Sequence, residues 1–324
     1  MSVKVGIIGC GNLGRTHAEC LASIEGAQLH AFCDVAEDKA QGLAATFGGY
    51  ATPEVDRLLD DRDIGAIYVC TQHDSHADLC IRAAEAGKHV MVEKPLALTV
   101  PECTRVGETV ERTGIKLMTA FKMRYYEMIL KAKELIPEPL LVTMQMMDNR
   151  WPDHIWANDP VKGGGNAISQ GCHACDILRF VAGRDPLEVY AVGGNYYTGT
   201  GVIDNLSAVF HFQGGLSGSW VQGDCNTPPL TSKFFMQLFA EGKSITLSDR
   251  LCTLTYSEQG KPPQVFRGVE TGFLEENRAF IRCIQEDTPP PIDHVDGLYA
   301  TLMPLQAFAS IKSGKPEPIA ALID

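Results

Sequence analysis

The N-terminal third of the chain alternates short apolar runs with longer amphipathic stretches. The apolar runs predict strands over Val3–Ile8, Gln28–Cys33, Ala66–Cys70, His89–Val92 and Lys116–Ala120. The amphipathic stretches predict helices over Arg15–Ile24, Lys39–Phe47, His76–Ala86 and Val100–Arg112. Strands that are apolar throughout and separated by helices are typical of a parallel sheet covered on both faces. The pattern therefore predicts a doubly wound parallel sheet in an α/β domain over residues 1–121.

Residues 122–324 show a different pattern, in which strand-like runs follow one another through short turns. These runs are Leu140–Met147, Leu187–Val192, Asn205–Phe212, Leu216–Val221, Phe234–Ala240 and Leu251–Tyr256. Helices are predicted over Met128–Leu135, Ala167–Ala182, Leu274–Gln285 and Val295–Ser313. Successive strands with short turns favour a large, mostly antiparallel sheet, and hence a second α/β domain. Phe235 and Phe239 add apolar side chains to the opposite face of their run, which predicts one face on helices and the other on a partner subunit.

Composition and charge narrow the class of protein. The chain has 324 residues, of which 45% are hydrophobic, and 28 Lys and Arg against 40 Asp and Glu give a net charge of −12. This charge disfavours a protein that coats nucleic-acid phosphates. No apolar stretch approaches the roughly 20 residues of a membrane span, and the first residues lack the layout of a signal peptide. We expect a cytoplasmic protein that binds neither nucleic acid nor membrane.

The cysteines suit a reducing compartment and do not predict a metal site. The eleven cysteines are scattered without the spacing of a disulfide framework. Cys172 and Cys175 form one CxxC pair, but no second ligand pair follows at the spacing of a zinc finger. We therefore predict no metal.

A glycine pattern follows the first predicted strand directly. Gly9-Cys10-Gly11-Asn12-Leu13-Gly14 matches G-x-G-x-x-G and opens a predicted helix. In that context backbone N–H groups and the helix N-terminus bind a pyrophosphate. The glycines allow the tight turn and let the pyrophosphate come close to the backbone. A plain turn also contains glycines, but the strand–loop–helix order favours dinucleotide binding. The predicted cofactor-binding residues of the loop are Gly9, Gly11, Asn12 and Leu13.

Asp34 ends the second predicted strand, about 20 residues after the loop, where a carboxylate accepts hydrogen bonds from the adenosine ribose. An ordinary surface aspartate is the alternative. No arginine follows to pair with a 2′-phosphate, and Glu37 and Asp38 add negative charge, although Lys39 lies close behind. We therefore expect NAD as the cofactor, with NADP less favoured.

The predicted strand His89–Val92 runs into Glu93-Lys94-Pro95. Ligands of open α/β sheets bind along the carboxyl edge, where this strand ends. A lysine held there can stabilise a developing alkoxide or lower the pKa of a neighbouring base. A solvated loop would carry the same charges, so both interpretations stand at this point.

Another group of polar residues lies on the helix predicted over Ala167–Ala182. Ser169, His173 and Asp176 are spaced i, i+4 and i+7 and so share one helix face. An imidazole, with an unperturbed pKa of about 6.5, suits removal of a hydroxyl proton. A lone helical histidine is more often structural, and spacing alone does not decide between the two.

The segment Trp151-Pro152-Asp153-His154-Ile155-Trp156 holds two of the three tryptophans. Aromatic faces with nearby Asp and His are typical of a sugar pocket, so Trp151, Asp153 and His154 are predicted substrate-binding residues. The alternative is a loop anchored by buried indoles, which suits Trp156 somewhat better than Trp151.

Together these motifs resemble the Gfo/Idh/MocA family, that of glucose–fructose oxidoreductase and inositol dehydrogenase. The similarity covers the glycine loop with His17 after it, Asp34, the turn Thr71–His76 and the run Ala86–Pro95, and continues more loosely through Phe121–Tyr125 and Gly163–Asp176. The resemblance implies a Rossmann domain followed by an α/β domain with an open sheet. It also implies NAD(P)-dependent oxidation of a sugar or cyclitol hydroxyl, and frequent homodimers or homotetramers.

The resemblance also implies roles for individual residues. Glu93 and Lys94 are expected beside the nicotinamide ribose, with Thr71, His73 and His76 as further cofactor contacts. Lys94 and His173 are the expected catalytic residues, with His173 the proton acceptor. Arg124 and Ser169 join them around the substrate.

Three positions depart from the family's pattern. Ser169 stands where many members have Asp, which implies a shorter proton relay or a substrate unlike inositol. Gln72 and His73 stand where members often have Pro-Asn. Lys122 stands where Asn is common, and it either hydrogen-bonds the substrate or lies in solvent. Asp176 matches the family, but the sequence leaves open whether it orients His173 or serves packing.

The sequence thus predicts an NAD-dependent dehydrogenase acting on a sugar, sugar derivative or cyclitol. Two alternatives from other classes stay open. One is an NAD-dependent glycosidase that uses transient oxidation and elimination, and the other is a non-catalytic NAD-sensing regulator.

Overall fold

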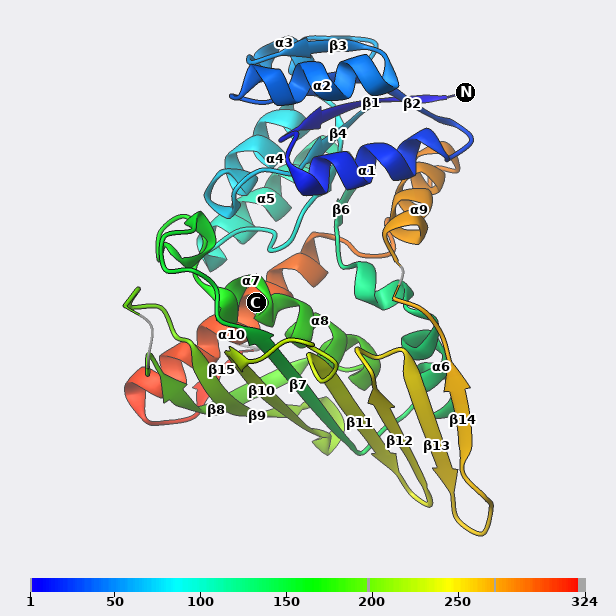
Figure 1. Cartoon of the computed structure of the whole chain (residues 1–324), viewed down its shortest axis with the longest axis vertical. Helices are drawn as coiled ribbons and strands as arrows, with labels where there is room; N and C mark the ends of the chain where they lie inside the picture. Colours follow the sequence, from blue (N-terminus) through cyan, green and yellow to red (C-terminus); the bar gives the residue numbers. More distant parts are fainter. Residues whose placement is uncertain (1, 197–198, 271, 320–324) are drawn as a thin grey trace. The chain divides into compact units, whose positions relative to one another are not determined.

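The computed structural model of the chain describes residues 2–196, 199–270 and 272–319 (Figure 1). Contacts between residues divide the chain into two units. The first comprises Met1–Lys122 and Phe273–Leu298, and the second comprises Met123–Gly272 and Tyr299–Asp324. The first unit is therefore built from two separate segments of the sequence.

The first unit contains a six-stranded parallel sheet in the order β3-β2-β1-β4-β5-β6. Its strands are β1 (Val3–Ile8), β2 (Ala27–Cys33), β3 (Tyr50–Thr52), β4 (Ala66–Val69), β5 (His89–Val92) and β6 (Leu117–Thr119). The parallel sheet predicted from the apolar runs is confirmed, because every predicted strand occurs. The three-residue edge strand β3 was not predicted, since it is too short to give a pattern.

Helices cover this sheet on both faces. They are α1 (Asn12–Ala22), α2 (Glu37–Phe47), α3 (Val55–Leu59), α4 (His76–Glu85), α5 (Val100–Thr113), α9 (Phe273–Gln285) and the start of α10 (His294–Ser313). The crossovers through α1 and α4 run outward from the centre of the sheet in opposite directions, so their right-handedness places these helices on opposite faces. Helix α4 packs against α5, and α1 packs against α9. A core of fully buried residues such as Ile67, Val69 and Val90 lies between strands and helices.

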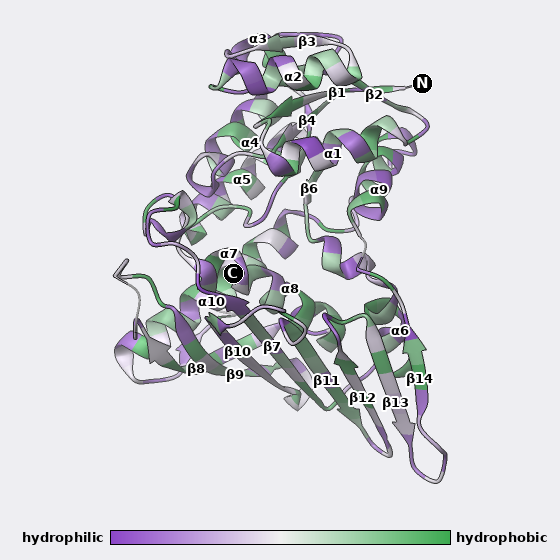
Figure 2. Ribbon diagram, viewed as in Figure 1, coloured by the Kyte–Doolittle hydropathy of each residue, from purple (hydrophilic) through white to green (hydrophobic). Residues whose placement is uncertain are grey.

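The second unit contains a nine-stranded sheet in the order β14-β13-β12-β11-β7-β10-β9-β8-β15. Its strands are β7 (Leu141–Asn149), β8 (Pro186–Gly194), β9 (Asn205–Phe212), β10 (Ser217–Asn226), β11 (Phe234–Ala240), β12 (Lys243–Ser248), β13 (Thr253–Glu258), β14 (Gln264–Arg267) and β15 (Glu317–Pro318). Among the described pairings only β7 with β10 is parallel, so the predicted mostly antiparallel sheet is confirmed. Strand β11 is hydrophobic along nearly its whole length (Figure 2).

Helices α6 (Glu127–Leu135), α7 (Asn166–Ser169), α8 (Gly171–Ala182) and the rest of α10 complete this unit. Helix α8 packs on β7 and β10, and the buried residues of β7 alternate with partly exposed ones. Hence one face of the sheet meets helices, as the sequence predicts. No helix within the described residues is both long enough and apolar enough to cross a membrane.

Two sequence predictions differ from the structure. The helix predicted over Ala167–Ala182 is interrupted at Gln170, which lies between the last residue of α7 and the first residue of α8. The predicted second domain, 122–324, included the helix over Leu274–Gln285, but the contacts group that helix with the first unit. Its apolar side chains, Phe280 and Ile281, are buried as α9 packs on α1 and β1. An amphipathic pattern specifies a buried face but not the surface that covers it.

Candidate active site

The glycine loop joins β1 to α1, and each glycine meets a different constraint. Gly9 has a φ of +94°, and a Cβ there would lie 2.5 Å from the Cys70 carbonyl oxygen. A Cβ on Gly14 would lie 2.0 Å from the Gly9 carbonyl oxygen. A Cβ on Gly11 would meet nothing within 4 Å. Gly9 and Gly14 therefore serve the turn and its packing, while Gly11 leaves space for a ligand.

The start of α1 suits an anion. Gly11 is the N-cap and offers no side-chain cap, and the first turn of the helix contains no acidic residue. Asn12 and Leu13, which open the helix, are exposed. The positive end of the helix and its first N–H groups can therefore accept a pyrophosphate, so the loop fits a dinucleotide.

Asp34 is tied to this loop by its carboxylate. Its Oδ2 accepts a hydrogen bond from the N–H of Cys10 at 2.7 Å, and its Oδ1 accepts one from the N–H of Ala36 at 2.9 Å. The side chain is only partly buried, so its charge stays at the end of β2 beside the loop. This position fits the predicted ribose contact, and carboxylate oxygens have further lone pairs for hydroxyl donors.

The turn after β4 is held mainly by His76. Its Nδ1 donates to the Pro95 carbonyl at 2.7 Å, while Nε2 lies 3.2 Å from the Thr71 carbonyl. Burial lowers the pKa of His76, so the neutral ring donates through the shorter contact. His76 is fully buried and supports this turn, and its predicted cofactor contact stays a prediction.

Two further residues of this turn were predicted to contact the cofactor. His73 is 5% exposed and packs edge-on against the ring of His76. Thr71 is partly exposed, and its hydroxyl shares a 2.7 Å hydrogen bond with Ser75. Thr71 is thus the more accessible of the two, and both contacts stay predictions.

The Glu93–Lys94 segment lies at the carboxyl end of β5. Glu93 is buried, and its Oε1 lies 3.1 Å from Nε2 of His17, on α1. Its Oε2 accepts the backbone N–H of Lys94 at 3.2 Å. Burial alone would raise the pKa of Glu93, but the His17 hydrogen bond and the Lys94 charge outweigh burial and lower it. A carboxylate therefore stands next to Lys94, which is half-buried.

Asn277 and Glu276 of α9 complete this group, and neither was recognised from the sequence. Asn277 contacts Nδ1 of His17 and donates to the Phe273 carbonyl at 2.7 Å. Glu276 is fully buried, and neither of its carboxyl oxygens has a hydrogen-bond partner among the described residues. Burial and the charge of Glu93 raise the pKa of Glu276 well above its usual value. Only the fold, which brings α9 to α1, reveals them.

Lys122 lies near Phe273 and Glu276, and both alternatives given for it from the sequence stay predictions. Its ammonium group lies 4.2 Å from the centre of the Phe273 ring, which is a cation–π contact. It also lowers the pKa of Glu276, against the effect of burial. In this structure Lys122 therefore lies against the first unit's own residues.

In the second unit, the predicted proton acceptor His173 and Ser169 are both buried, at 7% and 4% exposure. The break at Gln170 separates them, since Ser169 ends α7 and His173 belongs to α8. The expected single helix face for Ser169, His173 and Asp176 is therefore wrong as a continuous face. His173 and Asp176 still share α8.

Asp176 pairs with Arg124, which gives this acid a structural partner, while a role in orienting His173 stays a prediction. Arg124 Nε lies 3.0 Å from both carboxylate oxygens, and its Nη2 lies 2.6 Å from Oδ1. Both side chains are at least nine-tenths buried, and the guanidinium also lies over the ring of Phe180. Such a bidentate pair fixes the segment of residues 123–125 to α8 within the second unit. The predicted substrate contact of Arg124 stays a prediction beside this structural role.

A chain of side-chain hydrogen bonds, which was not predicted from the sequence, links β10 to α7. Trp220 Nε1 donates to Gln222 Oε1 at 3.2 Å, and Gln222 Nε2 donates to Asn166 Oδ1 at 2.6 Å. An indole N–H can only donate, so it fixes the orientation of both amides. The Nδ2 of buried Asn166 is left without a hydrogen-bond partner among the described residues. It can therefore donate to an oxygen atom of a ligand or of a water.

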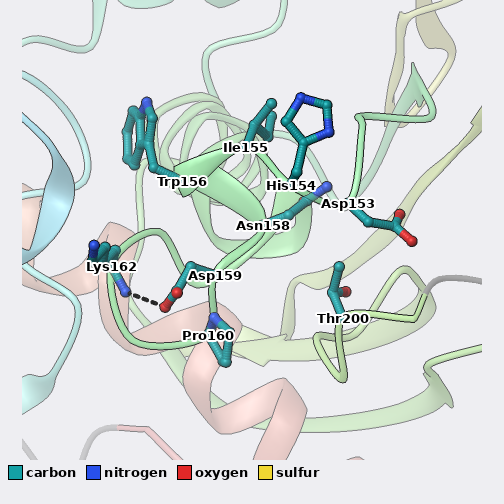
Figure 3. A pocket seen from close by; sticks show the side chains of 9 residues that line it. All are labelled: Asp153, His154, Ile155, Trp156, Asn158, Asp159, Pro160, Lys162 and Thr200. Carbon is teal, nitrogen blue, oxygen red and sulfur yellow. Dashed lines mark hydrogen bonds between the residues drawn. The ribbon is translucent and has the colours of Figure 1, made fainter.

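A pocket of about 400 Å³ opens in the second unit along the tryptophan-containing segment (Figure 3). It is lined by Asp153, His154, Ile155, Trp156, Asn158, Asp159, Pro160, Lys162 and Thr200. The predicted substrate residues Asp153 and His154 line it, whereas Trp151 does not. Trp156 is 38% exposed, so the buried-anchor interpretation is wrong for this indole. Mixed aromatic, acidic and basic side chains suit a polyhydroxylated ligand.

The fold and the glycine loop define a dinucleotide-binding oxidoreductase, and comparison with known proteins gives its family. Residues 3–121 match the family model described as "Oxidoreductase family, NAD-binding Rossmann fold", and residues 130–233 match the "GFO/IDH/MocA C-terminal domain". The chain belongs to the Gfo/Idh/MocA family of NAD-binding oxidoreductases.

Relatives of similar length support this assignment. Myo-inositol 2-dehydrogenase from Thermotoga maritima is 27% identical, over 96% of both chains. The scyllo-inositol 2-dehydrogenase (NAD(+)) from Bacillus subtilis is 26% identical over 97% of this chain and 95% of its own. A solved structure of levoglucosan dehydrogenase, in complex with NADH and levoglucosan, has a TM-score of 0.92. It is 21% identical and matches 99% of this chain and 100% of that one, which shows the shared fold.

Proposed function

We propose that the chain oxidises a hydroxyl-bearing carbon of a sugar, sugar derivative or cyclitol. NAD, when bound, supplies the hydride acceptor. The observation that carries this proposal is the half-buried Lys94, which follows the buried Glu93 carboxylate at the carboxyl end of β5. The two inositol dehydrogenases similar to this chain over nearly its whole length support the substrate class.

The roles of the residues follow from their chemistry. His173 takes the hydroxyl proton while hydride leaves the same carbon, which yields a carbonyl product and one released proton. Lys94 stabilises the negative charge that develops on the reacting oxygen. Asp153, His154 and the open face of Trp156 contribute contacts to hydroxyl groups and to the apolar C–H face of the ring.

We propose NAD over NADP because of the charge near Asp34. Its carboxylate is held at the loop by the N–H groups of Cys10 and Ala36, and Glu37 and Asp38 follow in the first turn of α2. A 2′-phosphate placed there would meet three carboxylates. Lys39 is exposed and compensates only part of this charge.

We also propose that the chain forms a homodimer or homotetramer in the cytoplasm. Support comes from apolar residues on the strands β8, β9 and β10 that stay exposed in the single chain. They are Tyr190, Val192, Val209 and Val221, with exposures of 45%, 55%, 53% and 39%. All eleven cysteines are free thiols, which suits a reducing compartment.

A panel of sugars, sugar acids and inositols, assayed with NAD and NADP, tests the function by NADH or NADPH formation. At least one compound should reduce NAD with a kcat/KM roughly tenfold or more above that with NADP. Lys94→Ala and His173→Asn should each lower kcat by about 10²–10⁴-fold, because each removes a group that acts on the reacting oxygen or its proton.

Lys4→Ala, which removes only an exposed ion pair with Asp63, serves as the control and should keep full activity. Full turnover by Lys94→Ala would contradict the assignment. Release of sugar from a glycoside without net NADH formation would favour the glycosidase, and no turnover with any compound of the panel would contradict the dehydrogenase.

A further inference from the structure

We propose that His17 and Asn277 are positioning residues for Lys94. Asn277 keeps the ring proton of His17 on Nε2, and His17 in turn holds the Glu93 carboxylate against the backbone N–H of Lys94. The inference rests on the proposed function, because it concerns a residue expected to act on the substrate.

The first step is the orientation of the Asn277 amide. The Phe273 carbonyl, 2.7 Å from Nδ2 of Asn277, can only accept a hydrogen bond, so the NH₂ group must face it. The other hydrogen of that NH₂ group is available to Nδ1 of His17, which lies 2.9 Å from Nδ2. The contact from Nδ1 to Oδ1 is longer, at 3.1 Å. His17 therefore accepts at Nδ1.

The second step follows from the opposite side of the ring. Nε2 of His17 lies 3.1 Å from Oε1 of Glu93, and an ionised carboxylate can only accept. Nε2 must therefore carry the proton. Both neighbours of the ring thus require the same tautomer, and His17 is fully buried, so no water competes for either nitrogen.

The third step is the effect on Lys94. Glu93 is 5% exposed, and its carboxylate depends on protein donors in place of water. His17 donates a hydrogen bond to Oε1, and the N–H of Lys94 donates one to Oε2. Without the His17 proton the carboxylate would lose a donor on one side. The hydrogen bond from the Lys94 N–H to Glu93 Oε2 would then weaken. The negative charge of Glu93 beside the Lys94 ammonium group would also be less favoured.

The other titratable groups near Glu93 are mostly neutral. Cys70 after β4, His76 from α4 and Glu276 from α9 lie close enough to Glu93 for its charge to affect their pKa values. Tyr68 of β4 packs edge-on against the ring of His17. Burial favours the neutral form of each of them, so Lys94 and Glu93 carry the main charges of the group. The charge of Lys122 lowers the pKa of Glu276, but burial outweighs this effect.

A matched pair of variants separates positioning from packing. In His17→Gln the amide nitrogen takes the place of Nε2 and still donates to Glu93. In His17→Asn the shorter amide takes the place of Nδ1 and does not reach Glu93. Both variants lose the aromatic contacts that the imidazole makes with Tyr68 and Phe273. The loss of these aromatic contacts is therefore common to the two variants, which differ in the donor to Glu93.

We expect kcat to fall roughly 10–100-fold in His17→Asn and to stay within about 3-fold of the unmutated chain in His17→Gln. The Kd for NADH, measured by fluorescence or calorimetry, should change by less than about 3-fold in both. Equal losses of kcat in the two variants, or losses that follow the melting temperature, would overturn the proposal.

Long-range ¹H–¹⁵N spectra of the histidine rings give a test without any substrate. The His17 resonance is identified because it is absent from the spectra of both His17 variants. At neutral pH it should show the Nε2–H tautomer. Asn277→Leu should change the balance of tautomers at His17. An Nδ1–H tautomer would overturn the inference while leaving the dehydrogenase assignment intact. An unmutated chain that reduces NAD with no polyol would instead overturn the proposed function, and the positioning role with it.

Discussion

At the scale of single residues, Glu276 is the least expected side chain in the first unit. It is fully buried, and none of the described residues donates to its carboxyl group. Glu93, nearby, is also buried but is served by His17. The two carboxyl groups therefore have opposite pKa shifts, lowered for Glu93 and raised for Glu276. Environment, not residue type, sets the charge of each.

Glu276→Gln should stabilise the protein increasingly as the pH rises. The unfolded chain releases the Glu276 proton above a pH of about 4.3, whereas the folded chain keeps it up to its raised pKa. The stability that the neutral carboxyl contributes is thus complete below that pH and is lost as the pH rises. The variant should gain about 1.4 kcal/mol per pH unit over this window, measured by urea unfolding at several pH values.

Glu275→Gln is the matched control, because the neighbouring residue is only partly buried. It should shift stability little and without this dependence on pH. A Glu276→Gln variant whose advantage stays constant from pH 5 to 9 would show that Glu276 ionises normally in the folded chain.

The sequence allowed some of these residues to be predicted and not others. Asp34 and Lys94 were recognisable because each follows a strand whose end faces a ligand in such sheets. The Arg124–Asp176 pair joins residues 52 positions apart, and no local pattern specifies such a partner. The exposure of Trp156 was predicted the wrong way round, since an indole suits both a core and a sugar pocket.

At the scale of elements, the close packing of α8 on β10 explains why residue 171 is a glycine. Gly171 begins α8, and a Cβ there would lie 2.6 Å from Cζ2 of Trp220. Trp220 is fully buried and also orients Gln222. The first residue of α8 can therefore lie this close to the sheet only if it is a glycine. This close approach helps to set the position of His173, two residues further along the helix.

Gly171→Ala and Trp220→Phe should be coupled. The first should destabilise the protein by about 1–3 kcal/mol through overpacking, and the second should destabilise it through a cavity and a lost hydrogen bond. Because the smaller ring leaves space for the methyl group, the double variant should be more stable than the sum of the single effects by roughly 0.5–3 kcal/mol. Urea unfolding of all four proteins measures this coupling.

Gly42→Ala, in α2, is a control with open space around its Cβ. It should be neutral or slightly stabilising, and additive with Trp220→Phe. Additive effects of Gly171→Ala and Trp220→Phe would mean that the methyl group and the indole do not compete for the same space.

The elements found from sequence alone were those with a strong pattern. Strand β9 was predicted at its observed bounds, Asn205–Phe212, because its buried and exposed residues alternate without interruption. Strand β12, Lys243–Ser248, was missed because only Ile245 and Leu247 in it are apolar and buried. The break at Gln170 was missed because no proline marks it.

At the scale of the whole molecule, the exposed face of the second sheet should determine how copies of the chain assemble. Tyr190 lies opposite Val209 in the pairing of β8 with β9, and Val209 lies opposite Ser219 in the pairing of β9 with β10. An apolar surface of neighbouring strands exposed in this way marks an interaction site in soluble proteins. A symmetric contact would place the same face on both partners.

Val209→Lys should therefore reduce the mass of the particle in solution, because it places a charge in the middle of that contact. Light scattering after gel filtration measures the mass. Val35→Lys, at a valine that is 94% exposed in the first unit, is the control and should leave the mass unchanged. An unmutated chain that is already monomeric, or a variant with unchanged mass, would exclude this face as the assembly surface.

The division of the nucleotide-binding unit between two segments has a consequence for synthesis on the ribosome. The strands β1–β6 are complete at Thr119, but α9, which carries Asn277 and covers the sheet beside α1, emerges only after the polypeptide has passed through Met123–Gly272. At roughly 5–20 residues per second, translation takes on the order of ten seconds or more to cover that distance. During this interval a sheet face rich in valine and isoleucine lacks its covering helix. We therefore expect the nucleotide-binding unit to reach its final fold only after residues 273–285 have left the ribosome.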